Sequence, residues 1–282
     1  MLRMLHRVCR LGLLVILAAG GISQTAVAAD KVYSVAVIPG APPVTMSKRW
    51  QPILDQLARD TGIQFRLQLF DRMAEFEREI WKGSADFIYA SPVQTVVARE
   101  AAGYIPLVRD GRLVEIGLFV RQDSPIRTID DLRGRKIAFV GNKNICSVYM
   151  QHELMGYGRK LDFEREYAGS TKNVLINVIL GKVDAGAVFS PEMEREPADT
   201  QAQLREIVTT PKIAPHPLSA HPRVPAEARD AVKKSLLKLA ATPAGAELLK
   251  PMRLDELVEA DYDRDYRRLE VIDIKGLTNW GE

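Results

Sequence analysis

Cysteine is scarce in this chain, which has two among its 282 residues, Cys9 and Cys146. We expect Cys9 to be lost with the leading segment described below, so the mature protein would keep one thiol and form no disulfide within the chain. His216 and His221 have no cysteine near them and no helical partner four residues away, so their stretch predicts a loop rather than a zinc site. Neither a disulfide nor a metal is expected to hold the fold together.

An excess of charge of either sign is also missing. The chain has 39 basic and 36 acidic residues. Arg3, Arg7 and Arg10 precede the first acidic residue, Asp30, so removal of the leading segment would leave 39 − 3 = 36 basic residues against 36 acidic ones. A nearly neutral protein lacks the excess of positive charge that attracts nucleic acid or an anionic membrane surface, and we expect neither as a partner.

The N-terminal apolar run, Leu11 to Ala19, is shorter than the roughly 20 residues needed to cross a bilayer. It follows three arginines and precedes the small-residue stretch Ala26-Val27-Ala28. This order predicts a signal peptide over residues 1–29, and therefore a periplasmic protein, in preference to a retained N-terminal anchor. We expect the mature protein to be soluble and monomeric.

Apolar runs alternate with amphipathic stretches along the chain, which predicts an α/β fold. Ser47 and Ser91 precede helical patterns and are expected to be N-caps. The expected strands cover residues 32–38, 65–70, 87–89, 104–109, 116–121, 136–140 and 163–167, and the expected helices cover 47–59, 73–82, 147–154, 173–180 and 226–239. Glycine-rich loops that would cradle a nucleotide are absent from the sequence.

One sequence of elements occurs twice, at residues 82–89 and 181–189: a helix end, a glycine turn, an aspartate and an apolar strand. Such a duplication predicts two similar lobes. We expect residues 30–117 and 214–282 to form lobe 1 and residues 118–213 to form lobe 2. Residues 116–121 would cross to the second lobe, and residues 206–213 would lead back.

Four stretches in order carry a resemblance to a known family: Pro42-Pro43 with Trp50-Gln51-Pro52, residues 83–87, residues 129–140 and residues 181–188. With them the chain resembles the periplasmic solute-binding proteins of phosphate, phosphite and phosphonate ABC transporters. The resemblance implies a type II periplasmic binding protein, in which each lobe is a mainly parallel sheet flanked by helices and two strands form the hinge. It also implies a function: capture of a small oxyanion in the cleft and its presentation to a membrane ABC permease, without catalysis or cofactor.

Loops that leave a strand and begin a helix can bind an oxyanion, because they present backbone N–H groups at the positive end of the helix dipole. Three such loops recur here, at residues 89–92, 144–147 and 169–171, although each taken singly also fits a plain N-cap. We predict that Pro42 and Pro43 shape the mouth of the site and that Asp184 or Ser190 lies on the far wall. The predicted lining residues are Tyr89, Ser91, Cys146, Ser147, Ser170 and Thr171.

The second loop departs from the family pattern, because Asn144-Ile145-Cys146-Ser147 stands where a Ser-Thr-Ser-Gly run is usual. A thiol is a weak hydrogen-bond donor but a soft ligand, and its pKa is expected to fall at a helix N-terminus. An alternative function is therefore an arsenite-binding sensor that uses Cys146 to bind the metalloid and signals to a membrane histidine kinase. A buried cysteine that packs like alanine is the other interpretation.

A thiol-dependent enzyme is the remaining alternative. His152 follows Cys146 by six residues, so the two side chains would meet only through tertiary contact. We expect no enzymatic activity and no resident metal or cofactor.

Overall fold

A computed structural model describes residues 31–156, 161–254 and 256–278. The predicted signal peptide, residues 1–29, lies outside the described residues. Within these ranges no helix has the length and apolar character that a bilayer-crossing segment requires.

The first sheet of the described chain has six strands in the order β11-β4-β10-β3-β1-β2. β1 is parallel to β2 and β3, whereas β10 runs antiparallel to β3 and β4, and β11 runs antiparallel to β4. The strands are β1 (Val32–Val37), β2 (Gln64–Gln68), β3 (Phe87–Tyr89), β4 (Ile105–Asp110), β10 (Pro217–Ala220) and β11 (Leu257–Glu259).

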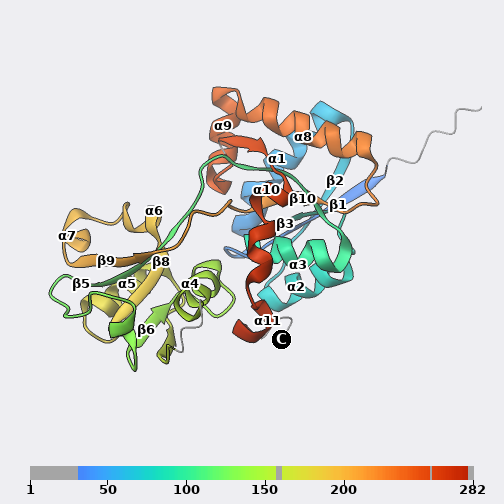
Figure 1. The fold of residues 1–282 in the computed structure, drawn as a ribbon. Helices are drawn as coiled ribbons and strands as arrows, with labels where there is room; N and C mark the ends of the chain where they lie inside the picture. Colours follow the sequence, from blue (N-terminus) through green and yellow to red (C-terminus); the bar gives the residue numbers. More distant parts are fainter. Residues whose placement is uncertain (1–30, 157–160, 255, 279–282) are drawn as a thin grey trace, which may run out of the picture. The chain divides into compact units, whose positions relative to one another are not determined.

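Helices cover both faces of this sheet. Side chains alternate along a strand, so Val35 and Val37 of β1 pack in one core with α1 (Pro43–Thr61) and α8 (Ala226–Ala240). Ala36, between them, packs in a second core with α2 (Met73–Lys82) and α3 (Pro92–Ala102), two helices that lie side by side in Figure 1. The loops between these strands and helices are thereby held at one edge of the sheet.

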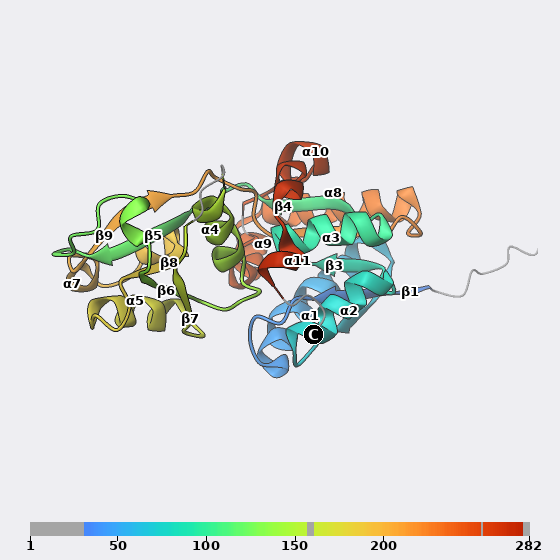
Figure 2. The same ribbon diagram turned by 60° about the horizontal axis from the view of Figure 1, so that its bottom comes forward.

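The second sheet has five strands in the order β7-β6-β8-β5-β9 within the described residues. α4 (Ile145–Met155) packs with one face, and α5 (Thr171–Ile179) packs with the other, as Figure 2 shows. The strands are β5 (Ile116–Arg121), β6 (Lys136–Phe139), β7 (Glu164–Tyr167), β8 (Ala185–Phe189) and β9 (Leu204–Thr209), with the short helices α6 (Ser190–Met193) and α7 (Ala198–Gln201) between β8 and β9.

Both sheets are mixed rather than mainly parallel. Parallel neighbours occur where a helix makes the crossover, as in β1-α1-β2 and β6-α4-β7. β5 and β10 are reached through segments that contain no helix, and they pair antiparallel with their neighbours.

Two crossing segments, residues 111–115 and 210–216, join the sheets and run side by side in Figure 1. An antiparallel bridge connects them, with Val114 N donating to Ile213 O at 2.9 Å and Ile213 N donating to Val114 O at 2.8 Å. The crossing segments predicted from the sequence, residues 116–121 and 206–213, lie partly elsewhere, because residues 116–121 form β5 and residues 206–209 belong to β9, both within the second sheet. Residues 111–115 and 210–216 are called the hinge below.

The duplicated motif forms the same structure in each sheet. Gly83 and Gly181 end their helices with φ of 60° and 66°, a left-handed conformation that glycine adopts without strain. The aspartate that follows then binds a backbone N–H of the neighbouring strand: Asp86 accepts from Ser34 N at 2.9 Å, and Asp184 accepts from Lys136 N at 2.8 Å. The motif therefore aligns each strand with its parallel neighbour.

Three helices begin earlier than predicted, and one of them, α5, begins at Thr171 because Ser170 caps it. α1 begins at Pro43 with Pro42 as its N-cap, and not after Ser47; proline is well suited to the first helical turn, where no intrahelical donor is needed. α4 begins at Ile145, because the side chain of Asn144 accepts a hydrogen bond from Cys146 N and caps the helix. Cys146 and Ser147 therefore belong to the first turn of α4.

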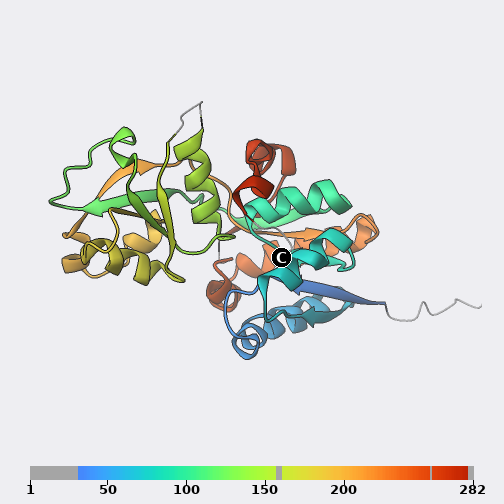
Figure 3. The same ribbon diagram turned by 90° about the horizontal axis from the view of Figure 1, so that it is seen from below.

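The C-terminal segment packs against helices of both sheets. It consists of α10 (Tyr262–Asp265), the 3₁₀ helix Arg267–Val271 and α11 (Ile274–Leu277). The 3₁₀ helix lies beside α3, as Figure 3 shows in red and green, and α11 contacts α4. Ile272 and Ile274 share one apolar core with residues of α3 and α4.

Candidate ligand-binding site

A cavity of about 220 Å³ lies where loops from both sheets meet the hinge. The β1–α1 loop, the ends of β3 and β8 and the hinge segments contribute to its wall. Most of the lining is apolar, with one cation and two polar aromatic rings among it. The lining residues are Ile38, Gly40, Met46, Tyr89, Pro92, Val114, Phe189, Pro191, Pro215, His216, Met252 and Arg253.

Tyr89, predicted from the sequence, is in this cavity. It ends β3, and its ring lies against Trp50 at a centroid distance of 4.9 Å. Its hydroxyl donates to Met252 O at 3.3 Å. Burial raises the pKa of Tyr89, with a further contribution from the nearby Asp110 carboxylate, so the phenol remains protonated and keeps its one hydrogen for donation.

His216 is a cavity residue that the sequence analysis assigned only to a loop. It lies on the return segment of the hinge, and its ring stacks on Tyr89 with centroids 5.6 Å apart. Burial, followed by repulsion from Arg253, lowers the pKa of His216 to about 4. The imidazole is thus neutral at pH 7. The sequence feature that could have pointed to His216 as a site residue is its position between Pro215 and Pro217, because the flanking prolines restrict the backbone of this segment.

Arg253 is the cation of the cavity, and no sequence pattern pointed to it. It follows the 3₁₀ helix Lys250–Met252 and has φ of 55°, a left-handed conformation that is unfavourable for a residue with a side chain. Its guanidinium donates to Glu192 Oε1 at 3.2 Å. A strained backbone at a cavity wall is typical of functional positions.

Glu192 of α6 lies close to two of the predicted residues, Thr171 and Cys146. One carboxylate oxygen accepts a hydrogen bond from the Thr171 hydroxyl at the start of α5. The other accepts from Arg253, and the carboxylate is close enough to Cys146 to raise the pKa of its thiol. The N-terminal turns of α4 and α5 therefore approach the same carboxylate as Arg253 does.

Cys146 is buried, with 1% of its surface exposed. Burial, with a smaller contribution from Glu192, raises its pKa well above the ordinary value, although hydrogen bonds from the backbone of Phe189 and of Cys146 itself oppose the shift. The expected lowering at the helix N-terminus was therefore wrong in direction: removal from water outweighs the helix dipole.

The predicted serines act as caps or internal bonds. Ser91 and Gln94 form a capping box at the start of α3, in which each side chain accepts from the other's backbone N–H. Ser170 caps α5 by accepting from Asn173 N. Ser147 is fully buried, and its hydroxyl oxygen accepts from Gly141 N at 3.3 Å. These residues shape the loops around the cavity, and none of the three is among its lining residues.

Asp184 and Ser190 lie at opposite ends of β8, separated by the five residues of that strand. At roughly 3.3 Å per residue this is a separation of about 20 Å, so the two cannot share one wall. Ser190 is next to the lining residues Phe189 and Pro191, and its hydroxyl lies 3.4 Å from Glu206 Oε1. Asp184 holds the strands together and is remote from the cavity.

The predicted mouth residues Pro42 and Pro43 start α1, and Gly40 of the same loop lines the cavity in their place. Within the described ranges no group of three or more His, Cys, Asp or Glu side chains is arranged to bind a metal ion.

A sequence profile of the family described as "ABC transporter, phosphonate, periplasmic substrate-binding protein" matches residues 35–266. The match covers both sheets and the hinge.

Solved structures share the fold. XAC2383 from Xanthomonas citri superimposes with a TM-score of 0.74 at 18% identity, over 87% of this chain and 98% of that one. PhnD1 from Prochlorococcus marinus gives a TM-score of 0.69 at 16% identity, over 87% and 98% of the two chains. PA3383, a phosphonate-transporter binding protein from Pseudomonas aeruginosa, gives 0.58 at 15% identity, over 83% of each. The predicted two-lobe α/β fold is confirmed.

Proposed function

Because this chain belongs to the family of periplasmic substrate-binding proteins of phosphonate ABC transporters, we propose that it captures a small phosphorus oxyanion and delivers it to a membrane permease. The class of ligand includes phosphonate, phosphite and phosphate. Two of the structural neighbours were solved with anions, PhnD1 with methylphosphonate and XAC2383 with chloride or ATP. This supports an anion as the ligand here.

The observation that carries the proposal is the environment of the Glu192 carboxylate. A hydroxyl from the first turn of α5 and the guanidinium of Arg253 both donate to it. Charge-assisted donors arranged around a carboxylate have the geometry that an oxyanion ligand requires. A ligand that displaced Glu192 would gain the donors of Thr171 and Arg253. It would gain the phenol of Tyr89, from the adjoining cavity wall, where it also replaced Met252 O as the acceptor.

Such a ligand would contact both sheets, since Thr171 belongs to the second and Tyr89 to the first. A ligand that binds both lobes favours the closed arrangement through its differential contacts. Delivery to a permease would follow from recognition of that closed form. Export through the predicted signal peptide would place the protein in the periplasm, where we propose that it acts as a monomer.

The test is calorimetric titration of ligand-free protein with methylphosphonate, phosphite and phosphate. At least one of them should bind, and at about 100 times its dissociation constant it should add roughly 2.7 kcal/mol of stability. Arg253→Gln should weaken binding at least about tenfold, because it removes the cation. Glu192→Gln should strengthen binding, since it removes the competing charge, while Glu194→Gln serves as the neighbouring control. Absence of binding to all three oxyanions, or unchanged affinity in Arg253→Gln, would reject the proposal.

The arsenite-sensor alternative depends on Cys146, and the structure does not favour it. Cys146 is the only cysteine within the described ranges, it is buried, and its raised pKa disfavours the thiolate that binds soft ions. Titration of reduced wild type and Cys146→Ser with arsenite decides the question. Arsenite binding by wild type that disappears in Cys146→Ser would restore the alternative and with it a kinase as partner.

A further inference from the structure

A second cavity, of about 230 Å³, lies beside the hinge and is lined mainly by cations. Its wall is formed by the end of β4, the two crossing segments and the C-terminal segment, and it shares no residue with the first cavity. Four basic side chains face one carboxylate there. The lining residues are Arg109, Leu113, Lys212, Ala214, Arg264, Asp265 and Arg268.

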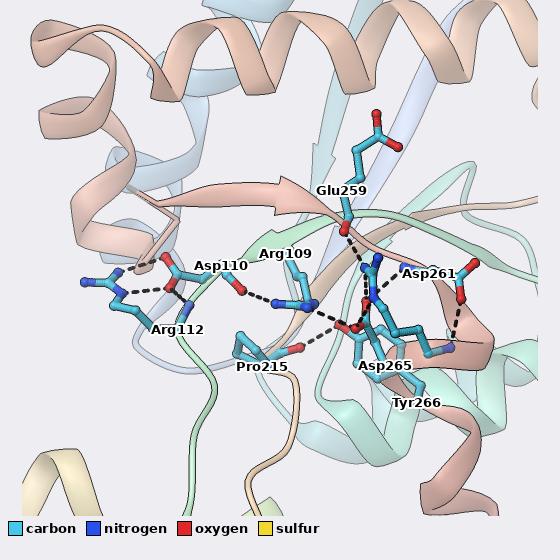
Figure 4. Close-up of polar contacts among 9 residues, drawn as sticks. Arg109, Asp110, Arg112, Pro215, Glu259, Asp261, Asp265 and Tyr266 are labelled. Atoms are coloured by element: carbon cyan, nitrogen blue, oxygen red, sulfur yellow. Dashed lines mark hydrogen bonds and ion pairs between the residues drawn. The ribbon is translucent and has the colours of Figure 1, made fainter.

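The single carboxylate, Asp265, is already neutralised. Arg109 donates to its Oδ1 at 2.9 Å, as Figure 4 shows. Arg264 donates to Oδ1 at 2.9 Å and to Oδ2 at 2.7 Å. Burial opposes ionisation of Asp265, but these bonds outweigh it and lower its pKa. One negative charge held between two guanidinium groups leaves the cluster with a net positive charge.

Asp110, which follows Arg109 in the chain, does not compensate for this charge. The Asp110 carboxylate accepts from Arg112 through both oxygens, at 2.7 and 2.8 Å. Arg109 donates only to the backbone carbonyl of Asp110, at 2.8 Å, and not to its carboxylate. Figure 4 shows Arg112 and Arg109 on the two sides of Asp110.

Arg109 also has an unused donor. Its side chain is 9% exposed, and its Nε has no hydrogen-bond partner among the residues described. A buried polar atom without a partner is uncommon in folded proteins and costs stability unless something else satisfies it. An acceptor bound in this cavity would do so.

The remaining two cations are available to a ligand. Lys212 is 61% exposed, and the closest carboxylate oxygen, on Glu115, is 3.9 Å from its Nζ. Arg268 is exposed on the 3₁₀ helix and has no ion-pair partner within the described chain. Two exposed cations at the rim and a buried one at the base suit an anion with several charges.

We propose that this cavity is a second anion site, which binds a small multiply charged oxyanion of the pyrophosphate type. Arg109 forms its base and Arg264 its side, and Lys212 and Arg268 close over the charge from the rim. The site is independent of the ligand proposed for the first cavity. Because Lys212 belongs to a crossing segment and Arg268 to the C-terminal segment, a bound anion links the hinge to the segment that packs on α3.

The test is titration with pyrophosphate by calorimetry at low ionic strength. Wild type should bind, and Lys212→Gln with Arg268→Gln should weaken binding at least about tenfold, because both rim cations are lost. Lys234→Gln with Lys238→Gln, which removes the same charge from an exposed face of α8, should bind as wild type does. Arg253→Gln, which alters the first cavity, should also bind as wild type does.

The proposal would be overturned if wild type did not bind pyrophosphate. It would also be overturned if the control double variant at Lys234 and Lys238 lost as much affinity as the double variant at Lys212 and Arg268. The third contrary result is binding that is lost in Arg253→Gln and kept in the double variant at Lys212 and Arg268. The last result would assign pyrophosphate to the first cavity. Melting temperatures of all variants establish that each is folded.

Discussion

At the scale of the residue, the His216 side chain both stacks on a neighbouring ring and is held in its neutral form. The ring stacks on Tyr89 in the wall of the first cavity, where burial and Arg253 lower its pKa to about 4. The folded protein therefore binds this proton less readily than the unfolded chain does. The neutral form stabilises the fold above pH 6.5, and that contribution is lost as the pH falls toward 4.

We predict that His216→Phe flattens the pH dependence of stability, because phenylalanine keeps a ring against Tyr89 and cannot be protonated. Between pH 7 and 4 the wild type should lose up to about 3 kcal/mol more than the variant, because a tenfold change in proton affinity corresponds to about 1.4 kcal/mol. Urea unfolding of both proteins at several pH values measures the difference. Parallel pH profiles would show that His216 is not held neutral in the native state.

At the scale of the element, the duplicated turn places two aspartates in equivalent positions with unequal surroundings. Asp86 accepts from the backbone and hydroxyl of Ser34 at 2.9 and 3.0 Å and from Arg223 Nε at 2.9 Å. Asp184 accepts from Lys136 N, its Oδ1 lies 3.6 Å from Arg135, and its side chain is 35% exposed. The same motif is therefore bound more tightly in the first sheet.

We predict that Asp86→Asn destabilises the protein by about 2–3 kcal/mol, since it weakens three bonds to a largely buried charge. Asp184→Asn, the matched variant, should cost about 1 kcal/mol or less, because solvent screens its partners. Chemical denaturation of the two variants compares the costs directly. Equal losses would mean that the exposed Arg135 contributes as much as Arg223 does.

At the scale of the whole molecule, a charge pair connects a helix that packs on the first sheet with a loop of the second sheet. Lys143, in the loop between β6 and α4, donates to Glu77 of α2 at 2.8 Å. The lysine side chain is 12% exposed and that of the glutamate is not exposed. A buried pair contributes little net stability when intact, but removing one partner leaves a charge in a poorly solvated place.

We predict that Lys143→Met destabilises the protein by about 3 kcal/mol and that adding Glu77→Gln recovers most of the loss. Lys233→Met is the control, because its partners Asp230 and Glu259 are exposed, and it should cost less than about 1 kcal/mol. Denaturant unfolding of the single and double variants gives the free energy of interaction between Lys143 and Glu77. Additive effects of the two substitutions would exclude an energetic link between α2 and the β6–α4 loop.

Much of the fold was predictable from local patterns. The helix 73–82, the strands 87–89 and 116–121 and the Ser91 cap coincide with the structure, because periodicity, glycine turns and capping residues act over a few residues. The start of α4 was missed because Asn144 competes with Ser147 as a cap, and only the geometry of the loop decides between them.

The sequence by itself determined the α/β class, the repeated motif and the position of Tyr89 at a strand end, since each depends on neighbours in the chain. Only the tertiary structure decided the site. His216, Glu192 and Arg253 come from three distant segments and meet through the packing of the hinge against both sheets. The state of Cys146 was decided in the same way, because its pKa depends on burial and on Glu192, and neither can be read from the residues beside it.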